Sequence, residues 1–126
     1  MKAVFMYHAV GDDDDIIGAD PHYGVSEAAF VTHLQVIQPR RSLAQVIEGA
    51  RLDTHILTFD DGHISNYVRA FPHLEAGQWC AEFYLNTAMV GKPGFVTWDH
   101  VREMHAAGLS MQSHADEHVY LSELQP

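Results

Sequence analysis

The chain has 126 residues, 47% of them hydrophobic, which is enough to bury the core of one small domain and too little for two. Seven Lys and Arg stand against 17 Asp and Glu, and the formal charge of −10 argues against unassisted binding to nucleic acid or to an anionic membrane surface. We therefore expect one domain over residues 1–126 and no nucleic-acid partner, and the single Cys80 excludes an intrachain disulfide.

The N-terminal segment predicts a strand and argues against a membrane span. Residues 3–8 read AVFMYH, a short apolar run of the kind that forms a buried strand. The run is too short for a spanning helix or a signal sequence, and a run of aspartates beginning at Asp12 soon follows it. We therefore expect a cytoplasmic protein with no membrane span.

Two helices are expected next, because each begins with a residue that caps a helix. Ser26 is an N-cap, and apolar residues recur at helical spacing after it as far as Ile37. Ser42 and Gln45 have the spacing of a capping box, in which each side chain accepts a hydrogen bond from the other residue's backbone N–H. The expected apolar face of this second helix consists of Leu43, Val46, Ile47 and Ala50.

The remaining chain predicts strands and helices in alternation. A helix at residues 64–77 should be interrupted by Pro72 and closed by Gly77 as the first residue past its end. Another should begin after the N-cap Thr97 and end on Gly108. The strands are expected at residues 55–59, 79–85 and 109–114.

The order of these elements, β-α-α-β-α-β-α-β, defines the expected fold class. Strands that are separated by helices, and are apolar enough to be covered on both faces, pair in parallel through right-handed crossovers. The fold class is therefore α/β. In such folds the loops at the carboxyl ends of the strands carry the chemistry, because they can vary while the core stays packed.

Polar residues at two of these carboxyl ends could form a metal site. His114 and His118 are four residues apart, so one helical turn would place both imidazoles on one face. One carboxylate from the neighbouring strand end, where Asp60 and Asp61 lie, would complete a set of two nitrogens and one oxygen. The cation would offset the repulsion between the carboxylates and leave the second free to take a proton from an attacking water. Gly62 would let the backbone turn so that both carboxylates face the site.

Each pattern also has a simpler explanation. An Asp-Asp-Gly sequence after a strand is often a solvated turn. In a chain with 10 histidines, two of them can easily fall four residues apart on an exposed helix. His63, directly after the glycine, could line a pocket or lie exposed. The spacing alone therefore leaves the metal site and the solvated surface both open.

Longer motifs in the chain resemble those of a known family. TFDDG at 58–62, SHADEH at 113–118 and MYHAV at 6–10, with the segments between them, resemble the polysaccharide deacetylase family, the NodB homology domain of carbohydrate esterase family 4. The resemblance implies the N-terminal part of a distorted (β/α) barrel. It also implies one divalent transition metal ion, with zinc expected, and hydrolysis of N- or O-acetyl groups on an acetylated carbohydrate.

The same resemblance assigns roles to four residues. Asp60 matches the catalytic base of the family. Asp61, His114 and His118 match its three metal ligands. Ala115 departs from the family pattern, which usually has Ser or Thr after the first metal histidine.

The resemblance ends where the sequence ends. The arginine-proline segment and the late histidine of the family have no counterpart before Pro126, so we expect self-association or a further C-terminal portion to cover the strand edges. Two other functions stay open. One is a metal-binding deacetylase-like module without activity, and the other is a hydrolase of the same fold that cleaves a C–N bond in a small cyclic amide.

Overall fold

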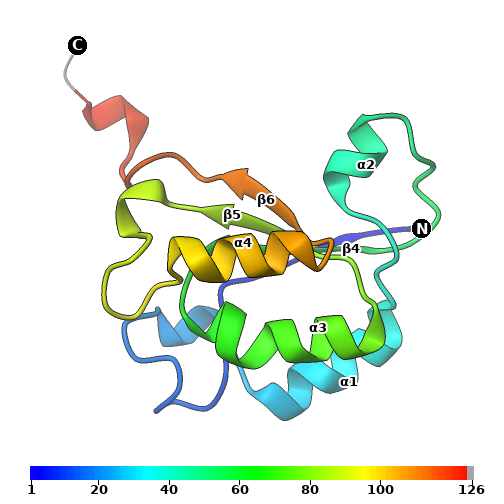
Figure 1. Cartoon of the computed structure of the whole chain (residues 1–126), viewed down its shortest axis with the longest axis horizontal. Helices are drawn as coiled ribbons and strands as arrows, with labels where there is room; N and C mark the ends of the chain where they lie inside the picture. The colour runs from blue at the N-terminus through cyan, green and yellow to red at the C-terminus, as the bar shows by residue number, and fades with distance from the viewer. Residues whose placement is uncertain (125–126) are drawn as a thin grey trace.

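The computed structural model describes residues 1–124, which form a fold around a central parallel sheet (Figure 1). The sheet has four strands in the order β1-β4-β5-β6, and every neighbouring pair is parallel. The strands are β1 Val4–Tyr7, β4 Ile56–Asp61, β5 Glu82–Leu85 and β6 Ser110–Ser113. The predicted α/β class and the parallel pairing are confirmed.

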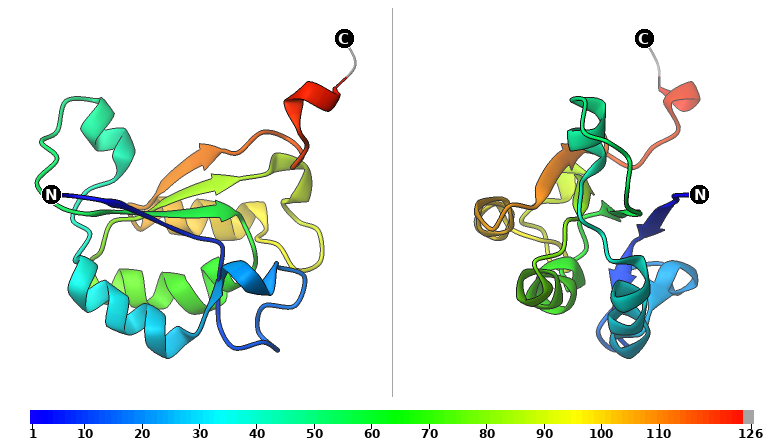
Figure 2. Two further views of the ribbon diagram at one scale, coloured as in Figure 1. Left: turned by 180° about the vertical axis from the view of Figure 1, so that it is seen from behind. Right: turned by 90° about the vertical axis from the view of Figure 1, so that its right-hand side faces the viewer.

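Three helices cover one face of the sheet, and a short helix lies on the other side of it (Figure 2). The covering helices are α1 Glu27–Ile37, α3 Phe71–Gly77 and α4 Trp98–Ala106. Phe59 and Phe83 stack with ring centroids 4.7 Å apart in the core beneath these helices. The other elements are α2 Leu43–Ile47, a parallel pair of β2 Ala9–Val10 and β3 Gly24–Val25, a π-helix Asn66–Ala70, and 3₁₀ turns Pro21–Tyr23, Thr87–Met89 and Leu121–Glu123.

The predicted helix starts are confirmed. The side chain of Ser26 accepts a hydrogen bond from the backbone N–H of Ala29 at the start of α1. The capping box of Ser42 and Gln45 is complete at the start of α2, and Thr97 caps α4. These starts depend on contacts within one turn of helix, which is why local sequence predicts them.

The predicted end of α3 is wrong by one residue. Gln78, not Gly77, has the left-handed conformation, with a φ of 51°. A Cβ atom at Gly77 would clash with the indole ring of Trp79, so the glycine leaves room for that side chain. Pro72 lies in the first turn of α3, and the helical path runs on through it from the π-helix Asn66–Ala70. Strand β5 also begins later than predicted, at Glu82.

The sheet face turned away from the three helices is only partly covered. Val4 and Met6 of β1 are 55% and 58% exposed, so the prediction that every strand is covered on both faces is wrong. Helix α2 buries none of its residues, and Ile47 is 78% exposed, so its expected apolar face is not packed. Self-association through this face stays a prediction.

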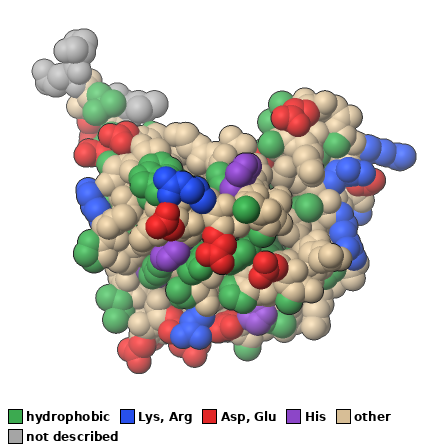
Figure 3. Space-filling model, viewed as in Figure 1, with side chains coloured by type: hydrophobic (Ala, Val, Ile, Leu, Met, Phe, Trp, Pro, Cys, Tyr) green, Lys and Arg blue, Asp and Glu red, His purple; other side chains and the backbone are tan. Residues whose placement is uncertain are grey.

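Positive side chains gather at the end of the molecule where the N-terminus and α2 lie (Figure 3). Lys2 and Arg40 line one depression there, and Arg41 pairs with Asp53 at 3.1 Å. This end corresponds to the amino ends of β1 and β4. These three cations therefore lie away from the carboxyl ends of the strands, where the site is expected.

Candidate metal centre

The two predicted aspartates are the last residues of β4, not the residues after it. Asp60 pairs in register with Tyr84, and Asp61 pairs with Leu85. Asp61 has a φ of 72° and Gly62 a φ of 77°, so the backbone turns at both residues. The turn expected at the glycine thus begins one residue earlier, and it places the carboxylate of Asp61 at the carboxyl edge of the sheet.

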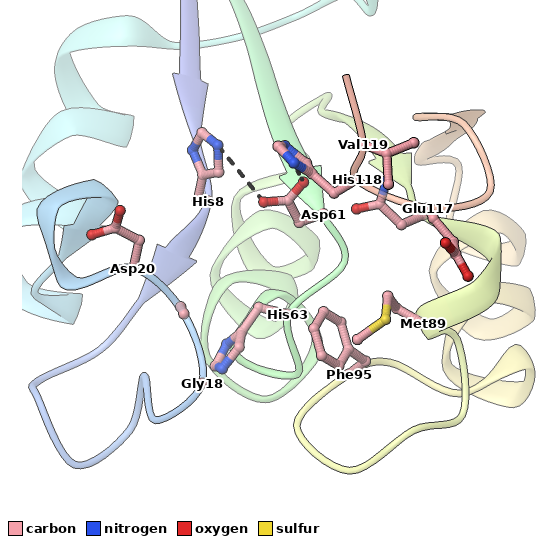
Figure 4. Close-up of a pocket in the computed structure, with 12 residues that line it drawn as sticks. His8, Gly18, Asp20, Asp61, His63, Met89, Phe95, Glu117, His118 and Val119 are labelled. Carbon is pink, nitrogen blue, oxygen red and sulfur yellow. Dashed lines mark ion pairs between the residues drawn. The ribbon is translucent and has the colours of Figure 1, made fainter. Parts of the chain in front are cut away.

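The structure brings Asp61, His114 and His118 together. Their strands, β4 and β6, are separated by β5, so the prediction that the site joins neighbouring strand ends is wrong. Oδ1 of Asp61 lies 3.6 Å from Nε2 of His114 and 3.9 Å from Nε2 of His118. One ligand atom from each residue lies within 4.8 Å of the others, and Figure 4 shows the carboxylate beside the ring of His118. Oδ1 of Asp61 is buried, yet it has no hydrogen-bond partner in the part of the chain that the structure describes.

His114 and His118 come together without a helical turn, so that part of the prediction is wrong. Ala115 has a left-handed φ of 60°, which bends the chain directly after His114. Two contacts with the segment after β5 hold this bend. The side chain of Asn86 donates to the carbonyl of His114, and the backbone N–H of Thr87 donates to the carbonyl of Ala115. The centroids of the two imidazole rings consequently lie 5.6 Å apart.

Asp60 lies close enough to the cluster to be affected by its charges. Burial raises the pKa of the Asp60 carboxyl group above its ordinary value, whereas the neighbouring imidazoles of His114 and His8 lower it. A half-buried carboxylate of this kind is a better proton acceptor than an aspartate on an open surface. Asp60 is not one of the three grouped ligands.

His8 adds another imidazole to the environment of Asp61. Its Nε2 lies 3.9 Å from Oδ2 of Asp61 (Figure 4). Its ring stacks on Tyr23 with centroids 4.8 Å apart, and its carbonyl accepts a hydrogen bond from the side chain of Asn66 at 2.8 Å. These contacts hold His8, the residue after β1, beside Asp61 at the end of β4.

A pocket of about 370 Å³ adjoins the cluster (Figure 4). One wall is the loop at residues 18–20, and the other contains Met89, Phe95 and Val119. His63 lies between these walls. None of the lining residues is Lys or Arg, so a ligand in the pocket would meet no fixed positive side chain of these types.

Sequence reasoning missed one polar residue that shapes the site, Asn86, and left the place of another, His63, open. Asn86 is 2% exposed and directly follows β5, so a polar residue at a strand end was the available signal. His63 could have lined a pocket or been exposed. It is 3% exposed and lines the pocket.

The donor set fits a divalent transition metal ion. Imidazole nitrogens and carboxylate oxygens bind zinc at about 2.0 to 2.2 Å, which places neighbouring ligand atoms about 3 to 3.5 Å apart. The observed separations of 3.6 and 3.9 Å from Oδ1 of Asp61 are only slightly wider. The unpaired Oδ1 supports the fit, because a buried carboxylate oxygen is costly unless a donor or a cation satisfies it.

The parallel sheet and the residues at its carboxyl edge together define a part of a (β/α) barrel with a candidate metal centre. A family model described as polysaccharide deacetylase matches residues 49–126, which is more than half of the chain. The chain belongs to the polysaccharide deacetylase family.

Similar proteins agree with this assignment. "Putative polysaccharide deacetylase YxkH" of Bacillus subtilis is 23% identical over 133 residues, which cover 98% of this chain and 45% of the relative. Among solved structures, the polysaccharide deacetylase BC0361 of Bacillus cereus has a TM-score of 0.82 and 26% identity, over 99% of this chain and 42% of that chain. The deacetylase PplD of Streptococcus pyogenes, solved in complex with acetate, has a TM-score of 0.81 and 25% identity, over 98% of this chain and 60% of that chain.

The likeness confirms the predicted fold, the N-terminal part of a distorted (β/α) barrel of the polysaccharide deacetylase type. The chain spans about half the length of the relatives that it matches. Among residues 1–124, no helix has both the length and the apolar character needed to cross a membrane.

Proposed function

We propose that the protein acts as a metal-dependent hydrolase that removes N- or O-acetyl groups from a carbohydrate. Membership of the polysaccharide deacetylase family supports the reaction class. In this proposal Asp61, His114 and His118 hold one divalent transition metal ion, which we propose to be zinc, and Asp60 is the catalytic base. The complex of PplD with acetate supports acetyl-group chemistry by analogy, since acetate is the product of such a hydrolysis.

One observation carries the metal-dependent part of the proposal. Oδ1 of Asp61 is buried, lacks a hydrogen-bond partner among the described residues, and lies within 4 Å of two imidazole nitrogens. A solvated turn would leave this oxygen in contact with water, and a structural carboxylate would accept a hydrogen bond. A bound cation explains both the burial and the missing donor.

The adjacent aspartates have separate roles in this proposal. The left-handed conformation of Asp61 turns its carboxylate toward the imidazoles, while Asp60 keeps its place in the strand beside Tyr84. A bound divalent ion would supply positive charge that polarises the acetyl carbonyl and acidifies the attacking water. Asp60 accepts the proton of that water, and burial adapts its carboxylate to this task by raising its pKa.

The charge of the pocket limits the proposed substrates. Asp20 and Glu117 line it together with Asp61, and none of its lining residues is Lys or Arg. A carbohydrate that carries carboxylate or phosphate groups would meet the carboxylates of Asp20 and Glu117 there with no Lys or Arg to offset the repulsion, in a chain with a formal charge of −10. We therefore propose a neutral or amine-bearing acetylated carbohydrate as the substrate.

Metal content and acetate release, measured on two variants, test the proposal. Asp60→Asn should bind zinc as the wild-type protein does but release acetate at least about 100-fold more slowly, because it lacks the base. His114→Ala should lose both zinc and activity. His105→Ala, which changes an exposed histidine in the last turn of α4, is the matched control and should retain both.

The outcomes separate this proposal from its alternatives. Full activity of Asp60→Asn would show that another group removes the proton. Zinc bound by the wild-type protein without acetate release from any acetylated carbohydrate would favour the metal-binding module. Ring opening of a small cyclic amide, which leaves a carboxylate and an amine on the same product molecule, without acetate release from a carbohydrate, would favour the other C–N hydrolase.

A further inference from the structure

His63 lies at the point where the two walls of the pocket meet, and it is almost completely buried. Its Nδ1 lies 2.8 Å from Oγ of Ser65 and accepts a hydrogen bond from the backbone N–H of the same residue at 3.1 Å. Its Nε2 lies 3.1 Å from the carbonyl oxygen of Ile17. Because Nδ1 accepts and a carbonyl can only accept, the proton of the neutral ring is on Nε2, which donates to Ile17.

This hydrogen bond holds the first wall of the pocket. Ile17 directly precedes the loop at residues 18–20, and the N–H of Ala19 is bonded to the carbonyl of Ile16 at 2.9 Å. The loop therefore has a backbone bond whose protection from solvent can be measured. Residues 18–20 belong to no helix or strand.

The backbone of His63 holds the second wall. His63 forms an isolated antiparallel bridge with Phe95, and their rings meet edge to face with centroids 6.4 Å apart. The neighbouring N–H of Ile64 donates to the carbonyl of Gly94 at 2.8 Å. A Cβ atom on Gly94 would lie 3.9 Å from the carbonyl oxygen of Ile17, so the two walls are close to each other. They meet at His63, which contacts Ile17 on one side and Phe95 on the other.

We propose that His63 is a positioning residue that fixes the loop at residues 18–20 against the Phe95 wall and thereby sets the width of the pocket beside Asp61. The width would determine which sugar unit can lie next to the acetyl group, so His63 acts on substrate selection. This inference rests on the proposed function. His63 follows the aspartate pair after one glycine, so the same turn carries a proposed metal ligand and the residue that positions the wall.

Two substitutions of His63 isolate the hydrogen bond to Ile17. His63→Phe keeps an aromatic ring but removes the donor, and His63→Gln supplies an amide donor that can reach the same carbonyl. Hydrogen exchange at Ala19 should be about tenfold faster in the Phe variant, as expected for the loss of one hydrogen bond, and close to wild type in the Gln variant. Exchange within β6 should be unchanged in both.

Ser65→Ala is the matched control. It removes the buried hydroxyl that lies 2.8 Å from Nδ1 and accepts from the N–H of Val10, so it should lower the melting temperature. The backbone N–H of residue 65 still donates to His63, so the ring keeps its tautomer and Ala19 should keep its protection. A general loosening of the protein would instead raise exchange at Ala19 in this variant also.

Binding and kinetics complete the test. With the tetramer of N-acetylglucosamine as substrate, His63→Phe should raise KM about tenfold and change kcat less than about threefold, since a positioning role affects binding more than chemistry. The zinc affinity of His63→Phe should stay within about twofold of wild type, because the proposed ligands at 61, 114 and 118 are intact. In His63→Gln, both KM and the exchange rate at Ala19 should return to wild-type values.

Three results would overturn the inference: unchanged exchange at Ala19 in His63→Phe, no recovery in His63→Gln, or an equal increase of exchange in β6. A wild-type protein that binds no zinc or releases no acetate would overturn the proposed function and the substrate-selecting role together. The exchange comparison would then still decide whether His63 positions the loop, so the two failures are distinguishable.

Discussion

Four residues other than glycine have a positive φ among residues 1–124, and they fall into two groups. Gln38 and Gln78 are C-caps of α1 and α3, where the left-handed conformation is routine. Asp61 and Ala115 are not helix caps, and each lies at or beside a proposed metal ligand. A left-handed residue of this kind costs about 1 to 2 kcal/mol, so the surrounding contacts must stabilise it. Backbone strain is thus concentrated at the two turns that bring the ligands together.

The glycine after Asp61 tests this reading of the turn. Gly62→Ala should lower the free energy of unfolding by about 3 kcal/mol for two reasons. The alanine must adopt a φ of 77°, and its Cβ would lie 2.9 Å from Cδ2 of Leu85. Gly91→Ala is the control, since Gly91 has a φ of 86° but open space around its Cβ position. It should cost about 1 kcal/mol. Urea unfolding of both variants measures the difference, and equal losses would show that the contact with Leu85 is unimportant.

At the scale of elements, α2 is attached to the sheet by its first turn and not by an apolar face. Oε2 of Glu82 in β5 accepts hydrogen bonds from the backbone N–H groups of Leu43 and Ala44, at 2.8 and 3.2 Å. Its other carboxylate oxygen lies 3.3 Å from the hydroxyl of Ser110 in β6. Glu82 is 2% exposed, so a buried carboxylate joins two strands to the positive end of a helix that buries none of its own residues.

Glu82→Gln should therefore destabilise α2 first. The amide keeps the shape of the side chain but replaces one acceptor oxygen with a donor and removes the charge, at a cost of about 2 kcal/mol in the free energy of unfolding. Hydrogen exchange should accelerate at residues 43–48 more than in β4. Glu48→Gln, at the exposed C-cap of α2, should change stability by less than about 0.5 kcal/mol. Equal effects of the two substitutions would contradict the role of Glu82.

At the scale of the whole molecule, local sequence patterns predicted the helix starts and the order of elements, which depend on residues close together in the chain. The caps at Ser26, Ser42 and Thr97 act within one turn of helix, and the parallel order of strands follows from their alternation with helices. Contacts between distant segments were not predictable from local pattern. Glu82 bonds to a residue 39 positions away, and Asn86 to one 28 positions away.

The histidine spacing shows the same limit within the candidate site. The spacing of four between His114 and His118 suggested a helical turn, but the rings meet because Ala115 bends the chain and Asn86 holds the bend. Resemblance to the deacetylase family identified the residues that come together, and only the structure showed which contacts hold them. Their roles as ligands stay a proposal.

The proposed ligands lie at the ends of β4 and β6, which are separated in the sheet by β5, so a bound ion would join distant parts of the chain. An ion that binds only the folded state raises the free energy of unfolding by about 2.7 kcal/mol when its free concentration is 100 times its Kd. For a chain of 126 residues, the melting temperature should then rise by about 10 °C. Calorimetry with and without zinc measures this shift. His114→Ala should lose most of it and His105→Ala should keep it, and an equal shift in both variants would place the stabilising ion elsewhere on the protein.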